Sequence, residues 1–462
     1  MKRTKIISLL AVLVLIVAAC AGDDGSDTTE GDPGTTLDGS PDTTGDNGGP
    51  DTTGMTDTTG GEGDNPLAEY GEDPTAADLG LVEKALGPVA PSDADSWNII
   101  LAAVARADQQ PDQATIDKAM ECWSNPSCDT GSGGELTMGY ADGGGHFNVW
   151  RGVSHMEAIL QALSYPEIGR IVSTEAGFAG PDPEMANIRF LIQDIQANGG
   201  SGFIVGYPDS GALVAPAVLE ATAAGIPYVS FSAGWVGLPD QDNALIPGED
   251  YLTVVGEDLC ALGESFADVL NTGVGEGTVG VLGGSPGNAL SLGWQRCLFP
   301  ALADGVEPIN PPPNEDTTVG DTFWLNDNAL QVVQGWLSTD PDIKGYAYEY
   351  SDGLNSAFAA YEGPIQDLTV ALRTDEQTLF CSWADADEPT YNIFFSAGGN
   401  FQARIGVTAA VMSINGATIP GEIVVPHVMR QVTELDCNPD RVNPFVSGTS
   451  LAPNSVLELM FG

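Results

Sequence analysis

The sequence predicts an α/β protein with two similar lobes, each built on a parallel sheet. From Glu135 onward, short apolar runs alternate with amphipathic stretches, a pattern typical of parallel strands joined by helices. The apolar runs are continuous, as expected for strands that are buried on both faces. The alternating region, 135–440, is too long for one sheet of roughly 130 residues, so two lobes are expected.

The strand candidates share a short apolar run bounded by turn residues. They are Leu136–Ala141, Ile168–Ser173, Phe203–Gly206, Tyr228–Phe231, Thr278–Leu282, Gly345–Tyr350, Thr378–Cys381 and Tyr391–Phe395. Between the third and fourth of these runs, a helix is expected over Ala212–Ala224, with Asp209 and Ser210 as capping candidates. Apolar residues also recur at helical spacing over 185–195, which predicts a helix with one apolar stripe.

The N-terminus has the layout of an export signal. Basic residues before position 6 precede an apolar run that ends at Ala19 and is shorter than the roughly 20 residues of a membrane span. Val17-Ala18-Ala19-Cys20 is similar to a bacterial lipobox, which implies cleavage before Cys20 and lipidation of its sulfur. The alternative is an ordinary signal peptide with an incidental cysteine. We expect a signal peptide over 1–19 and a chain anchored by lipid at the outer face of the cell membrane.

Composition limits the partners of the chain. It has 65 acidic residues against 15 Lys plus Arg, a formal net charge of −50. Nucleic-acid binding needs a basic footprint and is therefore excluded, and an anionic membrane surface would repel the protein. Residues 20–66 are rich in Gly, Asp and Thr and are predicted to be a disordered acidic tether. Residues 67–133 are predicted to be a helical extension, clearest over Leu79–Leu86 and Trp97–Ala107.

Cysteine usage supports export. Apart from Cys20, six cysteines remain, an even number that allows three disulfides in fifteen connectivities. We expect neighbours along the chain to pair: Cys122, Cys128, Cys260, Cys297, Cys381 and Cys437. Zinc is disfavoured because the chain has three histidines and no Cys-x-x-Cys. His146, His155 and His427 are dispersed without metal-ligand spacing, and no nucleotide-binding glycine motif follows a strand, so neither a metal nor a cofactor is expected.

A series of phrases in fixed order carries a family resemblance. They are Gly199-Gly200-Ser201-Gly202, Tyr207-Pro208-Asp209, Ala224-Gly225-Ile226-Pro227, Val255-Gly256-Glu257-Asp258, Leu282-Gly283-Gly284-Ser285, Pro341-Asp342-Ile343-Lys344-Gly345, Ser351-Asp352-Gly353 and Gly399-Asn400-Phe401-Gln402. Together they resemble the sugar-type (type I) periplasmic binding proteins, which serve ABC importers. The resemblance extends from Gly134 to about Thr433 and rests on the order and spacing of the phrases.

The resemblance implies two doubly wound, Rossmann-like lobes joined by a three-crossing hinge, with ligand bound between them. The crossings are expected near Phe231–Gly234, Phe395–Gly398 and Pro420–Pro426. The N-terminal lobe would comprise 134–233 plus about 397–420, the C-terminal lobe 234–396 plus about 421–440, and a tail would follow over 441–462. The implied role is capture of a small polar ligand, a sugar or polyol, by a monomer that delivers it to an ABC transporter permease without catalysis.

Nine residues are candidate ligand contacts, because their polar or aromatic side chains suit the hydroxyls and the C–H face of a sugar. They are Asn148, Trp150, Arg151, Trp294, Arg296, Glu349, Asp352, Gln402 and Arg404. By resemblance, a ligand-reaching Arg of the family falls at Trp294, so we expect either Trp294 or Arg296 to contact the ligand. The alternatives are that both tryptophans fill the core and Arg151 forms a surface pair, that Asp352 caps a helix, and that Gln402 and Arg404 are solvated.

Two departures from the resembled family concern charge. An Asp-Arg pair after the strand ending at Phe231 is replaced by Ser232-Ala233. An Asp expected after the strand candidate Thr378–Cys381 is replaced by Ser382-Trp383. These losses leave open an unusual sugar, a polyol or a ligand that is not a sugar.

One motif in the sequence suggests a different function class, a hydrolase. Gly283-Gly284-Ser285-Pro286-Gly287 matches the G-x-S-x-G elbow of α/β-hydrolases, and His427 follows it in the chain. Pro286 lacks the backbone N–H that the elbow uses in its oxyanion hole, which disfavours an enzyme. A ligand-sensing receptor with the same two-lobed body remains an alternative, as does a structural surface lipoprotein.

Overall fold

The structure is a computed structural model that describes residues 65–89, 93–232, 235–314, 316–361, 365–386, 390–438, 441 and 446–462. The predicted signal peptide, Cys20 and nearly all of the predicted tether lie outside these residues. Residues Gly63–Gly462 form one compact unit. In the part of the chain that the structure describes, no helix combines the length and apolarity needed to cross a bilayer.

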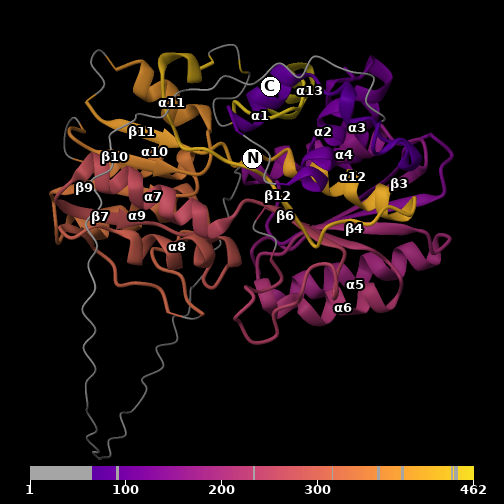
Figure 1. The fold of residues 1–462 in the computed structure, drawn as a ribbon, viewed down its shortest axis with the longest axis horizontal. Coiled ribbons are helices and arrows are strands. Elements are labelled where there is room, and N and C mark those ends of the chain that lie inside the picture. The colour runs from indigo at the N-terminus through magenta and orange to yellow at the C-terminus, as the bar shows by residue number, and fades with distance from the viewer. Residues whose placement is uncertain are drawn as a thin grey trace, which may run out of the picture. The chain divides into compact units, whose positions relative to one another are not determined.

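Two mostly parallel sheets organise this unit, as predicted (Figure 1). The first has the order β1-β3-β2-β4-β5-β6-β12 and the second β13-β11-β10-β9-β7-β8. The strands of the first sheet are β1 (Ser127–Asp129), β2 (Leu136–Asp142), β3 (Ile168–Glu175), β4 (Gly202–Tyr207), β5 (Tyr228–Phe231), β6 (Thr253–Gly256) and β12 (Glu422–Val424). Those of the second are β7 (Gly277–Val281), β8 (Val306–Pro308), β9 (Ile343–Tyr348), β10 (Thr369–Leu372), β11 (Asn392–Phe395) and β13 (Arg430–Gln431).

We call each sheet with its covering helices a lobe. The α-helices are α1 (Leu79–Leu86), α2 (Ala94–Asp108), α3 (Gln113–Ser124), α4 (Val149–Leu163), α5 (Pro181–Ala197), α6 (Ala215–Ala223), α7 (Leu259–Val274), α8 (Ala289–Ala301), α9 (Asn326–Leu337), α10 (Ser351–Ala357), α11 (Gln377–Ala384), α12 (Gln402–Ile414) and α13 (Asn454–Phe461). Short 3-10 helices are η1 (Ala68–Tyr70), η2 (Pro74–Ala76), η3 (Gly211–Val214), η4 (Phe358–Ala360) and η5 (Glu434–Asp436). In the first lobe, α5 and α6 cover one face of the sheet, and α4 and α12 cover the other (Figure 1).

The apolar core has two parts. The smaller lies between the first sheet and helices α5 and α6, and includes the fully buried Leu191 and Ile204. The larger runs from helices α1 to α3, across α4 and α12, and into the second lobe. Burial of the sheets on both faces explains why most strand runs are largely apolar rather than strictly alternating.

The predicted helical extension consists of α1, α2 and α3, and it packs on the first lobe. Arg106 of α2 anchors it, because its guanidinium bonds Glu72 at 2.8 Å and lies 3.7 Å from the ring centroid of Tyr165. After α3, strand β1 adds an antiparallel edge to the first sheet by pairing with β3. The extension is therefore part of the first lobe.

The three disulfides pair neighbours along the chain, as predicted. Cys122–Cys128 joins α3 to β1. Cys260–Cys297 joins α7 to α8, and Cys381–Cys437 joins α11 to the segment after β13. Each bond fastens a helix to a neighbouring element of its own lobe.

One predicted strand is wrong. Thr378–Cys381 lies inside α11, and the strand of this region is β10, eight residues earlier in the chain than α11 begins. A four-residue apolar run fits a buried helix turn as well as a strand, so periodicity could not separate them. The predicted departure from the family at Ser382-Trp383 is therefore also wrong. The residues that follow the strand of this region are Arg373, Thr374 and Asp375.

The first crossing between the lobes also differs from the prediction. Strand β6 was not predicted, and it lies in the first sheet between β5 and β12. The chain therefore enters the second lobe after Gly256 rather than near Phe231–Gly234. The second crossing, between β11 and α12, falls where it was expected, and the third lies between β12 and β13.

Candidate functional site

A cavity lies where strand ends of the two lobes face each other, and we call it the cleft cavity. Its walls are Asn148, Trp150, Arg151, Tyr207, Leu290, Trp324, Glu349, Tyr350, Arg373 and Thr374. Of the first four, Asn148, Trp150 and Arg151 lie at the start of α4 and Tyr207 ends β4, whereas the others come from the second lobe. The space left for the centre of a water-sized sphere is about 20 Å³, room for about one water molecule. The lobes are thus closed on one another.

Asn148 sets the first wall by starting α4. Its side-chain oxygen accepts a hydrogen bond from the backbone N–H of Arg151 at 3.2 Å, which caps the helix. Trp150 and Arg151 consequently occupy the first turn of α4, facing the second lobe. The Nδ2 of Asn148 donates to the backbone oxygen of Trp324 at 3.4 Å, and Trp150 Nε1 donates to that of Gly398 at 3.3 Å.

Arg151 is a buried cation held by two carboxylates. Its guanidinium bonds Asp142 and also Asp209, the latter at 2.8 Å, and it lies 3.9 Å from the ring centroid of Tyr207. Burial alone would lower the pKa of Arg151, but these two acids raise it above its usual value. Burial also raises the pKa of Asp209 above its usual value, although the nearby Arg151 acts to lower it. Arg151 therefore stays charged without any anionic ligand.

Glu349, at the end of β9, organises the opposite wall. Its carboxylate accepts hydrogen bonds from the indole Nε1 of Trp294, at 2.6 Å, and from that of Trp324. Burial raises the pKa of Glu349 above its usual value. The Trp324 ring sits over Gly284, where an added Cβ would meet it at 1.9 Å. A glycine is therefore required beneath this aromatic wall.

The backbone at Trp324 is strained. Phe323 and Trp324 both have positive φ, 55° and 50°, a region that non-glycine residues rarely adopt. Such conformations persist where surrounding contacts over-determine them, and they concentrate at binding sites. Here the bond between Trp324 and Glu349 supplies such a contact.

Arg373 follows β10 and links the second lobe to the crossing segments. Its Nη2 donates to Glu257 at 3.0 Å and to the hydroxyl of Ser232 at 2.8 Å. Burial alone would lower the pKa of Arg373, but the nearby Glu257 raises it. Two non-glycine residues near the strand ends are left-handed: Ser232, with φ of 61°, directly follows β5, and Ala397, with φ of 62°, lies two residues after β11.

Direct hydrogen bonds also join the lobes beside the cleft cavity. The Ser285 hydroxyl donates to the Asp209 carboxylate at 2.9 Å, and Asn288 Nδ2 donates to the Asp209 backbone oxygen at 3.0 Å. Ser285 of the G-x-S-x-G match is thus paired with a carboxylate of the other lobe.

Four of the nine predicted contacts line the cleft cavity: Asn148, Trp150, Arg151 and Glu349. The other five lie elsewhere. Trp294 is fully buried behind Glu349, Asp352 accepts from Asn326 Nδ2 at 2.6 Å, and Arg296 pairs with the exposed Asp240 at 2.8 Å. Gln402 and Arg404 are buried at the start of α12, where Arg404 bonds Glu157 and Gln161. Contact of any of the nine with a ligand stays a prediction.

Six lining residues were missed: Tyr207, Leu290, Trp324, Tyr350, Arg373 and Thr374. Tyr207 ends β4, so the rule that ligands lie beyond strand ends could have found it. Arg373 and Thr374 were missed because their strand was misplaced. Trp324 lies in a loop before α9, and no local pattern indicated it.

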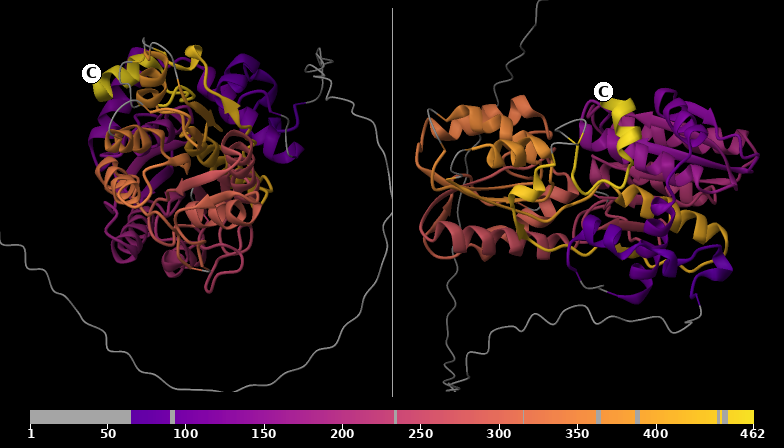
Figure 2. Two further views of the ribbon diagram at one scale, coloured as in Figure 1. Left: turned by 90° about the vertical axis from the view of Figure 1, so that its left-hand side faces the viewer. Right: turned by 90° about the horizontal axis from the view of Figure 1, so that it is seen from above.

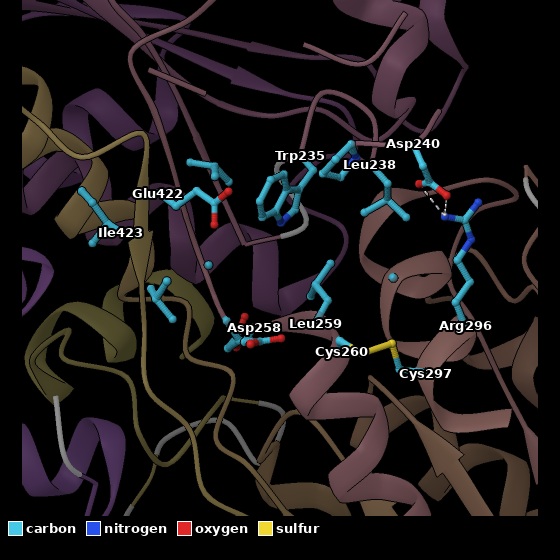
Figure 3. Close-up of a pocket in the computed structure, with 16 residues that line it drawn as sticks. Trp235, Leu238, Asp240, Asp258, Leu259, Cys260, Arg296, Cys297, Glu422 and Ile423 are labelled. Carbon is cyan, nitrogen blue, oxygen red and sulfur yellow. Dashed lines mark hydrogen bonds and ion pairs between the residues drawn. A yellow bond between two sulfur atoms is a disulfide. The ribbon is translucent and has the colours of Figure 1, made fainter. Parts of the chain in front are cut away.

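A larger cavity, of about 370 Å³, lies against β6, β12 and the start of α7 (Figure 3). Arg296 is the one predicted contact among its lining residues, and Figure 3 shows it pointing toward Asp240, with Glu422 on the other side of the cavity. The polar groups here do not converge, and the cation is already paired. The cleft cavity is the better candidate site despite its small volume, because strand ends of both lobes meet there.

A buried carboxyl beside the site gives a pH-dependent prediction. Burial raises the pKa of Glu376 to about 8. A folded-state pKa above the usual value means that the folded protein binds the extra proton, so stability falls as pH rises from about 4.5 to 8, by up to about 1.4 kcal/mol per unit. Glu376→Gln retains an oxygen to accept from Ser351 and Thr374, and should remove this fall.

Urea unfolding from pH 5 to pH 9 checks this prediction, because it gives the difference in free energy of unfolding between the variant and the parent protein at each pH. The exposed Glu83→Gln is the matched control and should leave the curve unchanged. A parallel pH profile for Glu376→Gln and the parent protein would contradict the prediction.

Comparisons with known proteins agree with this geometry. A family model described as periplasmic binding protein domain matches residues 169–371. A search of curated proteins gave no match. Among solved structures, an ABC sugar transporter subunit from Rhodobacter sphaeroides has a TM-score of 0.52 at 15% identity, covering 64% of this chain and 98% of that one.

Two further solved structures carry ligands. A periplasmic solute-binding protein from Actinobacillus succinogenes with bound D-allose has a TM-score of 0.52 at 19% identity, covering 65% of this chain and 99% of that one. A solute-binding protein from Bacillus halodurans with bound myo-inositol has a TM-score of 0.51 at 16% identity, covering 66% and 97%. These likenesses establish the fold. The family model places a periplasmic binding protein domain over residues 169–371, and the solved structures show that the two-lobed fold of this chain is that of ABC transporter solute-binding proteins.

Proposed function

We propose that the protein captures a small, neutral polyhydroxyl ligand, a sugar or polyol, in the cleft cavity and delivers it to the permease of an ABC importer. The observation that carries the proposal is the chemistry of the cavity walls. Aromatic faces, cationic donors and a carboxylate acceptor converge there from both lobes. Sugars present both an apolar C–H face and hydroxyls that donate and accept, so they match such walls.

The charges of the walls favour a neutral ligand. Arg151 is balanced by Asp142 and Asp209, and Arg373 is balanced by Glu257. A ligand therefore need not bring a negative charge to satisfy either cation. The D-allose and myo-inositol in the similar structures are neutral polyhydroxyl compounds, which supports the same class of ligand for this chain.

Ligand entry requires the lobes to separate, since the closed cleft has room for about one water molecule. The three crossings are the natural hinge, and a ligand that contacts both walls would favour the closed form. The permease would then recognise closed protein. The export signal and lipobox-like Val17-Ala18-Ala19-Cys20 support lipid anchoring through Cys20 outside the cell membrane.

A thermal-shift screen against sugars and polyols tests the function. A ligand at 100-fold above its Kd should stabilise the protein by about 2.7 kcal/mol. Trp150→Ala should remove that shift, because the Trp150 ring forms part of the cavity wall. Trp97→Ala, which replaces a partly buried tryptophan of α2 outside the cavity, is the matched control and should keep it. An equal shift in both variants would place the ligand elsewhere, and no shift with any compound would argue against this ligand class.

A further inference from the structure

Three side chains with metal-ligating atoms meet beyond the ends of β2 and β3, outside the cleft cavity. His146 lies in the loop after β2, His155 on α4, and Glu175 at the end of β3. Their ligand atoms all lie within 4.8 Å of one another. We propose that His146, His155 and Glu175 form a binding site for a divalent transition-metal ion such as Zn²⁺.

The directions of the ligand atoms support this site. His146 Nε2 lies 3.0 Å from Glu175 Oε1 and is also in short contact with His155 Nδ1. A single proton on His146 Nε2 can make a full hydrogen bond to one of these acceptors, not to both. A metal ion would accept lone pairs from all three atoms at once.

The second ring nitrogen of His155, Nε2, has a hydrogen-bond partner, as is usual in metal-binding histidines. Its Nε2 lies 2.6 Å from the hydroxyl of Ser173. When Nε2 donates its proton to Ser173, Nδ1 keeps a free lone pair that points at His146. Metal-ligating histidines usually have such a partner on the other nitrogen, which fixes the tautomer and the ring.

Both rings are held in place before any ion binds. His146 stacks on Trp123 of α3 at 5.1 Å, and His155 stacks on Tyr140 of β2 at 4.3 Å. His155 itself is buried, at 1% exposed. The side chains of His146 and Glu175 are 25% and 39% exposed, so an ion can reach the site from solvent.

The donor set selects the class of ion. Two imidazole nitrogens and one carboxylate suit zinc, cobalt, nickel or copper, whereas magnesium and calcium favour all-oxygen sites. Three protein ligands leave one position of a tetrahedral zinc ion open to water. A bound ion would join the loop over 143–148 to α4 and β3, and that loop also carries Asn148 of the cleft cavity.

The test is a zinc titration of the purified protein after dialysis against EDTA, followed by calorimetry. We expect one equivalent of Zn²⁺ to bind, and Mg²⁺ not to compete. His146→Gln and Glu175→Gln should each weaken zinc binding at least about tenfold, and Ser173→Ala roughly 10- to 100-fold. His427→Gln, which changes a histidine outside the cluster, is the matched control and should bind zinc as the parent does.

Two further measurements keep the outcome clear. Circular dichroism should show that the two variants at solvent-reachable positions, His146→Gln and Glu175→Gln, remain folded. Trp150→Ala should bind zinc normally, so failure of the sugar proposal and failure of the metal proposal are distinguishable. Zinc binding of equal strength in the parent and in the His146→Gln, Glu175→Gln double variant, or no zinc binding by the parent, would overturn the proposal.

Discussion

Glu157→Ala is expected to destabilise the protein by about 3–5 kcal/mol, because it leaves a buried cation without its partner. Glu157 lies on α4 and is fully buried, and its Oε2 accepts from Arg404 of α12. Its Oε1 accepts from the Ser450 hydroxyl and from the backbone N–H groups of Leu451 and Ala452, each at 2.8 Å. The substitution would leave Arg404 with Gln161 and would remove the carboxylate acceptor of three further donors, of which Ala452 N keeps a 3.3 Å bond to the Ser450 hydroxyl.

The same carboxylate holds the last part of the chain, which Figure 2 shows in yellow reaching both lobes. This part of the chain is also held by the second lobe. There, the Asp375 carboxylate accepts hydrogen bonds from the Ser447 hydroxyl and from the backbone N–H of Thr449, the latter at 2.9 Å. The segment over 446–452 therefore bridges the two lobes. We expect Glu157→Ala to release it, so that its backbone amides exchange faster with solvent.

Urea unfolding and amide hydrogen exchange check this prediction. Glu121→Ala is the matched control, since Glu121 is 52% exposed and forms a surface pair with Lys118 that is expected to contribute at most about 1 kcal/mol. A loss below about 1 kcal/mol in Glu157→Ala would mean that the buried pair does not hold the fold together.

Arg151→Ala is expected to cost a similar 3–5 kcal/mol at neutral pH and also to abolish ligand binding. It would leave Asp142 and Asp209 buried without their shared cation. The sequence alone predicts that this variant loses the ligand and keeps its fold, and the two buried carboxylates now predict a loss of stability as well. Arg151→Ala is therefore a poorer site test than Trp150→Ala.

The pH dependence of this variant follows from the same charges. Without Arg151, the pKa of Asp209, already raised by burial, should rise further. A raised folded-state pKa gives stability that falls as pH increases, so acidification should partly restore the Arg151→Ala variant relative to the parent. Asp142→Asn with Asp209→Asn in the same chain should restore it at neutral pH. The exposed pair Arg189–Glu220 provides the control, Arg189→Ala, and an equal loss in both arginine variants would contradict the prediction.

The sequence predicts most of the fold, because buried strands can be recognised in it as short apolar runs. Seven of the eight strand candidates match strands, and the exception is the run at Thr378–Cys381. This error had consequences for the site, because it hid Arg373 and Thr374 and suggested a loss of charge that the structure does not have. Strand β6 was missed because its run of four residues is too short to identify from sequence alone. It forms a strand by pairing with β5 and β12.

The candidate site was predictable where function follows strand ends, and not where distant segments meet. Asn148, Trp150 and Arg151 follow the loop after β2, at the start of α4, and were found. Trp324 reaches the cavity from a loop whose strained backbone has no local signature. The contact between the two histidines could not be predicted for the same reason. His146 and His155 are nine residues apart and meet only because the loop after β2 folds back on α4.

The most direct test of the central claim is a crystal structure of the protein with the compound that gives the largest thermal shift. The account predicts one ligand between Trp150 and Tyr207 on one side and Trp324 and Glu349 on the other, with its hydroxyls bonded to Arg151 or Arg373. A ligand bound away from the facing strand ends, for instance in the larger cavity beside Arg296, would contradict it.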